Sequence, residues 1–246
     1  MTSESGLTAG DGGAAVTDAA PRRPRARLVL AAIVAAAVIG IAAFSAGWLA
    51  APRISTPSDT SVEAGFARDM QQHHDQAVQM AMIVREQSKD PEVSSLAYDI
   101  ATSQAQQSGQ MYAWLNLWQL PQASTQPTMT WMLQPTLDGS DGHGHGGGGA
   151  TSTSTAAPDD MAMVPGQPMP GMATEADIDE LEQLEGVEAE RLFLTLMIAH
   201  HQGGVEMAEA VEARSTNPLV LALAKAIVFA QSGEIAYMQE LLAARQ

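Results

Sequence analysis

The residues of this chain best suited to chemistry are its six histidines, because four of them form two adjacent pairs. The pairs are His73–His74 and His200–His201, and a methionine lies three residues before each pair, at Met70 and Met197. Thioether and imidazole ligands together favour Cu(I), and imidazole also binds Cu(II) and zinc. A methionine stripe usually only fills a core. The repetition of the whole arrangement nevertheless favours metal binding over packing alone.

The composition narrows the classes of function. The chain has 14 methionines and no cysteine, which excludes disulfides and thiolate metal sites. Its 28 acidic and 12 basic residues give a net charge of −16, which repels phosphate backbones and attracts cations, so nucleic-acid binding is not expected. The sequence has no P-loop, no Gly-x-Ser-x-Gly elbow and no Glu-x-x-His di-iron motif. We therefore expect a binding protein without catalytic residues or an organic cofactor, not an enzyme.

An internal repeat predicts how these residues are positioned. A shift of 127 residues aligns residues 66–111 with 193–238 without a gap and gives 16 identities over 46 positions. The break between helices recurs as well, as Asp90-Pro91 and Asn217-Pro218. Each copy reads as a helical hairpin, and one hairpin alone buries too little apolar surface. Two packed copies predict an all-α protein with an antiparallel four-helix bundle.

Helical periodicity places each histidine pair and its neighbouring methionines on one face of the first helix of each hairpin. The second helices add polar and thioether stripes, Gln104 with Met111 and Gln231 with Met238. Adjacent residues of a helix diverge by about 100°, so the two histidines of a pair are not expected to hold one ion side by side. This spacing favours several small sites over one dense cluster.

An uncharged apolar run from Leu28 to Ala51 is long enough to span a bilayer, and four arginines precede it. The positive-inside rule then places the N-terminus in the cytoplasm and the bulk of the chain outside the cell membrane, in a periplasmic or extracellular space. A cleaved signal peptide is the alternative, although its apolar core is usually shorter. We expect an uncleaved, single-pass anchor.

The predicted organisation has five segments. They are a disordered cytoplasmic tail (1–27), a transmembrane helix (28–51), a first helical hairpin (60–121), a low-complexity linker rich in Met, Gly and His (122–173), and a short acidic helix with the second hairpin (174–246). Thr174 and Asp177 have the spacing of a capping box that opens the acidic helix. The linker carries His143, His145, Met161, Met163, Met169 and Met172, which could bind metal weakly or be ordinary linker residues.

The double motif Met-x-x-His-His-x-x-x-x-x-Met-Ala, with Gln231-Ser-Gly-Glu-Ile-Ala-Tyr-Met238, resembles the bacterial family of domain of unknown function 305 (DUF305). That family includes exported copper-binding and copper-resistance proteins. The resemblance spans about Val62 to Arg245 apart from the linker, and it implies a ferritin-like fold, an exported location and copper binding through Met and His. Carried over by position, the candidate metal ligands are Met70, His73, His74, Met80, Met111, Met197, His200, His201, Met207, Glu234 and Met238.

The two copies of the repeat differ in two features. The first copy has Gln107 where the second has Glu234, so we expect its site to be altered or weaker. Gly203 and Gly204 follow the second histidine pair, and we expect them to loosen that helix, because glycine costs about 1 kcal/mol relative to alanine.

The sequence therefore predicts a membrane-anchored, extracytoplasmic protein that binds copper for buffering, resistance or transfer. Cu(I) is the favoured ion, Cu(II) the second, and zinc the alternative metal. A copper donor or acceptor protein is the expected partner. The competing hypothesis is a structural or interaction module, a bundle displayed on the membrane whose Met and His side chains only pack.

Overall fold

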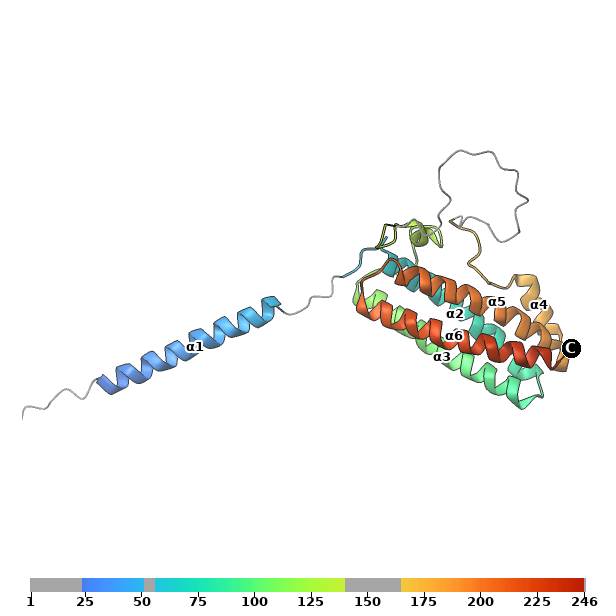
Figure 1. Cartoon of the computed structure of the whole chain (residues 1–246), viewed down its shortest axis with the longest axis horizontal. Coiled ribbons are helices and arrows are strands. Elements are labelled where there is room, and N and C mark those ends of the chain that lie inside the picture. Colours follow the sequence, from blue (N-terminus) through green and yellow to red (C-terminus); the bar gives the residue numbers. More distant parts are fainter. Residues whose placement is uncertain (1–23, 51–55, 140–164, 246) are drawn as a thin grey trace, which may run out of the picture. The chain divides into compact units, whose positions relative to one another are not determined.

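The computed structural model describes residues 24–50, 56–139 and 165–245, which form helices and connecting loops without a β-strand (Figure 1). The helices are α1 (Pro24–Ala50), α2 (Val62–Gln87), α3 (Pro91–Leu117), η1 (Thr130–Leu133), α4 (Glu175–Gln183), α5 (Gly186–Glu212) and α6 (Pro218–Ala243). The chain divides into two compact units, Met1–Arg53 and Ile54–Gln246. Most of the expected tail and the linker residues His143, His145, Met161 and Met163 lie outside the described residues.

The first unit contains α1, whose side chains from Arg27 onward are all exposed within that unit. Its length and apolar composition are sufficient to cross a membrane, as expected for the anchor. Helix α6 passes the same test of length and composition. Because α6 buries one face in the second unit, we interpret it as a core helix of the bundle.

Local sequence signals set the ends of the bundle helices. The Asp90 side chain accepts hydrogen bonds from the backbone N–H groups of Glu92 and Val93 at the start of α3. Asn217 caps α6 in the same way, and a proline follows each of these caps. The predicted capping box is also present at α4, where Thr174 and Asp177 bond reciprocally. Helix α3 ends at Leu117, within the predicted first hairpin segment (60–121).

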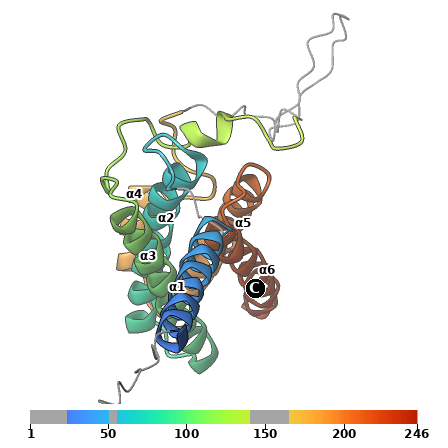
Figure 2. The same cartoon turned by 90° about the vertical axis from the view of Figure 1, so that its left-hand side faces the viewer.

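The second unit is an antiparallel four-helix bundle made of two repeated hairpins, which confirms the predicted fold class. Helices α2 and α3 form one hairpin and α5 and α6 form the other (Figures 1 and 2). The hairpins meet mainly through α2 and α5, whereas an open groove runs between the outer helices α3 and α6.

Equivalent hydrogen bonds join the hairpins at opposite ends of the bundle. The Ser88 hydroxyl donates to Glu190 Oε1 at 2.7 Å. The 127-residue shift relates this pair to Ser215 and Glu63, and there the Ser215 hydroxyl donates to Glu63 Oε1 at 2.6 Å. The two contacts hold the hairpins in an arrangement that is close to two-fold symmetric.

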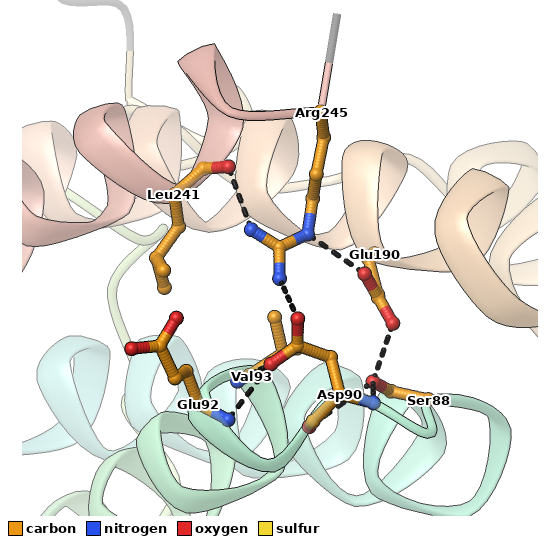
Figure 3. Close-up of polar contacts among 7 residues, drawn as sticks. All are labelled: Ser88, Asp90, Glu92, Val93, Glu190, Leu241 and Arg245. Carbon is orange, nitrogen blue, oxygen red and sulfur yellow. Dashed lines mark hydrogen bonds and ion pairs between the residues drawn. The ribbon is translucent and has the colours of Figure 1, made fainter.

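Arg245 strengthens one of these ends (Figure 3). Its Nε donates to Glu190 Oε2 at 2.7 Å, and a terminal guanidinium nitrogen donates to Asp90 Oδ2. Glu190 is almost fully buried, so its carboxylate depends on Arg245 and Ser88 for compensation. The end of the chain is thereby tied to both hairpins.

Part of the stretch expected to be linker packs on the bundle instead. Trp131, in η1, is buried and meets the Phe66 ring edge-on at a centroid distance of 5.7 Å. Its indole N–H and the backbone N–H of Met129 both donate to the buried carboxylate of Asp69. Burial raises the pKa of Asp69 and these hydrogen bonds oppose that rise. The composition of the stretch did not reveal these anchors.

Candidate metal centre

A layer of polar side chains crosses the middle of the bundle, with two residues from each helix. They are His73 and His74 on α2, Gln104 and Gln107 on α3, His200 and His201 on α5, and Gln231 and Glu234 on α6. All four histidines are fully buried. The layer lies between two apolar clusters, one reaching Phe66 and Val211 and the other reaching Val84 and Phe193. A polar layer at this depth requires compensating partners.

The closest pair of imidazoles joins the two hairpins. The rings of His73 and His200 are in contact, with centroids 3.8 Å apart and their planes tilted by 34°, whereas the centroids of the adjacent His200 and His201 are 6.4 Å apart. The expectation that adjacent histidines diverge agrees with this geometry. The structure adds that equivalent histidines of the two copies meet.

One hydrogen bond recurs in both halves of the layer. His74 Nε2 lies 2.7 Å from Gln107 Oε1, and the equivalent His201 Nε2 lies 2.7 Å from Glu234 Oε2. His73 Nε2 lies 3.1 Å from the backbone oxygen of Pro170. Because these oxygens can only accept, each of the three rings donates from Nε2. This pattern, an imidazole held by an oxygen through its distal nitrogen, is typical of histidines that bind metal through the other nitrogen.

Several polar atoms of the layer have no partner within the described part of the chain. They are the Nδ1 atoms of His73, His74, His200 and His201, Nε2 of His200, and both amide atoms of Gln104 and Gln231. A buried polar group without a partner costs about 1–3 kcal/mol. The presence of this many unpartnered groups in one layer therefore needs an explanation. A cation held by the free ring nitrogens would supply the missing partner.

Burial keeps His73, His74 and His200 in their neutral form. It lowers the pKa of His73 to about 4 and the pKa of His74 to about 3, and it lowers the pKa of His200 well below its ordinary value. A neutral imidazole has a free lone pair, which is the form that binds metal. These three rings are therefore competent ligands at neutral pH.

The six candidate methionines are all fully buried, and they lie in two groups on opposite sides of the layer. Met70, Met111 and Met207 belong to one apolar cluster, and Met80, Met197 and Met238 belong to the other. The 127-residue shift exchanges the two groups. The structure thus brings three thioethers into each cluster and does not bring all six together.

A short strap, residues 169–173, closes the layer on the α2–α5 side. Its Pro170 oxygen accepts the bond from His73, and the Gln76 side chain bonds both the N–H and the carbonyl oxygen of Ala173. The strap passes so close to α5 that a Cβ at Gly203 would collide with the Pro170 oxygen. This role of the strap is not visible in the sequence, because His73 and Pro170 are 97 residues apart in the chain.

The two glycines after His201 do not interrupt α5, and the expected loosening of this helix stays a prediction. The helix runs unbroken from Gly186 to Glu212. Gly203 makes room for the strap, and a Cβ at Gly204 would collide with the Gln231 side-chain oxygen. Close approach of other groups explains both residues.

Among the described residues, no three His, Asp or Glu side chains converge around one point in the way that a metal cage requires. The His73 and His200 rings lie against each other at a tilt of 34° and no three ligands share a centre, so holding an ion would require side-chain rotation. The fit of the site to copper rests on its donors: neutral imidazoles with unpartnered nitrogens between two groups of thioethers. Glu234 is the carboxylate among the candidate ligands.

Residues 63–242 match the family described as domain of unknown function DUF305. The fold is similar to that of a DUF305 protein from Streptomyces coelicolor, with 42% identity, a TM-score of 0.62 and coverage of 76% of this chain and 96% of that one. A DUF305 fragment from Deinococcus radiodurans is 34% identical, with a TM-score of 0.52 and coverage of 74% and 96%.

CopM in its Cu(I)-bound form has a TM-score of 0.50 and 21% identity, with 76% of this chain and 97% of that chain covered. At this identity the likeness shows a shared fold alone. No curated protein is similar enough to count as a match.

Proposed function

The chain belongs to the DUF305 family, and from this premise we propose that it is a membrane-anchored, extracytoplasmic protein that binds copper. Its role is to buffer copper, confer resistance to it, or pass it to a donor or acceptor protein. The observation that carries the proposal is the buried layer of four histidines with unpartnered ring nitrogens. We further propose that the protein is not an enzyme.

His73, His74, His200 and His201 would hold the ion, with Nδ1 as the binding atom wherever Nε2 is committed to an oxygen. The two methionine groups supply soft ligands on either side of the layer. Imidazole with thioether favours Cu(I), and imidazole with a carboxylate also suits Cu(II) and zinc. The shared fold with CopM, which was solved in Cu(I)- and Cu(II)-bound forms, is consistent with this choice.

The location of the protein is part of the proposal. The four arginines before the apolar run that starts at Leu28, together with the composition of that run, support a single-pass anchor with the bundle outside the cytoplasm. Protease treatment of intact cells or spheroplasts should degrade the bundle. Protection of the bundle from the protease would place it on the cytoplasmic side and contradict the proposal.

The direct test is competition with a chelator of known affinity, for Cu(I) and for Cu(II), using the full-length protein in detergent. Replacing His73, His74, His200 and His201 with Gln should abolish high-affinity binding, whereas His143→Ala with His145→Ala, as the matched control, should leave it unchanged. The single variant His200→Gln tests the same point if the quadruple variant does not fold. Binding that is unchanged in the layer variants would refute the assignment.

The rival function is a structural or interaction module, and the complete burial of the six methionines in apolar clusters favours it. A ligand that binds only the folded state raises the melting temperature. Copper should therefore raise the melting temperature of the wild-type protein but not that of the histidine variants. A melting temperature that does not respond to copper would support the rival, and a larger response to zinc would indicate that zinc is the metal.

A further inference from the structure

The two halves of the histidine layer are equivalent in position but not in charge. His74 bonds the neutral amide oxygen of Gln107, and His201 bonds the carboxylate of Glu234, both at 2.7 Å. The 127-residue shift relates both the histidines and their partners. One half of an otherwise repeated arrangement therefore has an anionic group beside its imidazole and the other has none.

Glu234 also connects the buried layer with solvent. Its side chain is 24% exposed, whereas the side chain of His201, which it contacts, is fully buried. Glu234 lines the groove between α3 and α6, which has a volume of about 930 Å³. The α3 side of this groove carries two further acids, Glu92 and Asp99. A cleft lined by one sign of charge raises the local concentration of the opposite ion, so cations are concentrated next to the Glu234 carboxylate, which contacts the His201 ring.

We propose that Glu234 is the specificity-determining residue that makes the second half of the layer prefer Cu(II) and that receives this ion from the α3–α6 groove. This inference rests on the proposed copper-binding function. An ion held by the His201 ring would lie within reach of the Glu234 charge, because the ring and the carboxylate are in contact. The carboxylate accepts the bond from Nε2 of the ring whose Nδ1 would bind the ion, so it acts on the ion through its charge and through the ring.

The charge effect is strongest for the more highly charged ion. Coulomb attraction scales with the charge of the ion and is larger in a partly buried site than in water. Loss of the carboxylate should therefore weaken Cu(II) binding more than Cu(I) binding. The Gln107 half already shows the neutral arrangement, so Glu234→Gln converts one half of the layer into a copy of the other.

The test compares full-length wild-type protein and the Glu234→Gln variant in detergent, with Cu(II) and Cu(I) each titrated against a chelator. We expect the Cu(II) affinity of the second half to fall by about tenfold or more, while the Cu(I) affinity stays within about threefold. A tenfold differential loss corresponds to a rise in the Cu(II)/Cu(I) reduction potential of about 59 mV. The electron paramagnetic resonance spectrum of bound Cu(II) should change as well.

Two further variants keep the test specific. Glu240→Gln removes the same charge from an exposed position on α6 outside the groove and should leave both affinities unchanged. Gln107→Glu should raise the affinity of the first half for Cu(II), and it decides the question if Glu234→Gln does not fold. Removing Glu92 and Asp99 together, as Gln and Asn, should slow Cu(II) loading in stopped-flow measurements.

Equal losses for the two ions, no change, or the same effect from Glu240→Gln would each overturn the inference about Glu234. Loading kinetics that do not respond to the groove variants would overturn the assignment of the groove as the entry route. A wild-type protein that binds neither ion would instead refute the proposed function, so the two failures are distinguishable.

Discussion

At the level of single residues, the histidine layer combines burial with incomplete hydrogen bonding. His200 has neither ring nitrogen partnered among the described residues, although its ring is in contact with the ring of His73. Packing alone would favour apolar side chains at this depth, because a buried imidazole without partners is costly. Under the proposed function, the layer is a binding site that costs stability in the metal-free protein.

We predict that acid destabilises the metal-free bundle. In the folded state the pKa of His73 is about 4 and that of His74 about 3, whereas unfolded histidine has a pKa of about 6.5. As the pH falls below 6.5, the unfolded state takes up protons first, so the free energy of unfolding decreases towards pH 4. At about 1.4 kcal/mol per pKa unit, His73 alone contributes on the order of 3 kcal/mol.

Urea unfolding at pH values between 7 and 4.5 measures this slope. His143→Gln with His145→Gln removes two histidines outside the layer and should leave the slope as in the wild type. A free energy of unfolding that does not change between pH 6.5 and pH 4.5 would show that the buried histidines are not held neutral by the fold.

At the level of elements, the strap and α5 position the histidines of the two hairpins relative to each other. The strap contacts α2 through His73 and Gln76 and passes over α5 at Gly203. The approach to α5 requires the absence of a side chain at Gly203. A helical glycine that was expected to weaken α5 is thus a contact point for the segment that closes the site.

We predict that Gly203→Ala destabilises the bundle by about 2 kcal/mol, since the added Cβ would displace the Pro170 oxygen that His73 bonds. Gly109→Ala is the matched control, because Gly109 is also helical but has no group near its missing Cβ. That control should stabilise the protein by about 1 kcal/mol. Thermal unfolding measures both, and equal shifts in the same direction would mean that the strap does not pack on α5.

At the level of the whole molecule, the two ends of the bundle share one type of contact but differ in strength. The Ser88–Glu190 and Ser215–Glu63 bonds are equivalent, and Arg245 reinforces the first of them (Figure 3). The 127-residue shift places Trp118 at the position equivalent to Arg245. The duplication is thus symmetric in its helices and asymmetric in its charges, as in the histidine layer.

We predict that Arg245→Met lowers the free energy of unfolding by about 2 kcal/mol, because it leaves the buried Glu190 carboxylate with Ser88 as its remaining partner. Lys225→Met removes an exposed cation from the first half of α6, away from Arg245, and should change stability by less than about 0.5 kcal/mol. Chemical unfolding at neutral pH measures both variants. Equal effects would show that Arg245 does not join the hairpins.

The sequence by itself determined the parts of this protein that depend on local or repeated patterns. The caps at Asp90, Thr174 and Asn217 involve groups two or three residues apart, so their spacing is visible in the chain. The 127-residue repeat predicted the two hairpins, because each hairpin must bury its apolar face against the other. The candidate ligands were visible in the sequence because the histidine pairs and their methionines recur in both copies of the repeat.

Only the tertiary structure decided which of those residues meet. The contact of His73 with His200, the separation of six methionines into two groups, and the opening of Glu234 into a groove depend on how each helix is rotated against its neighbours. Helical periodicity specifies a face but not the side chain that lies opposite it. The strap over His73 was hidden for a related reason: it is held by backbone oxygens and close approach, which leave no pattern of side-chain types in the sequence.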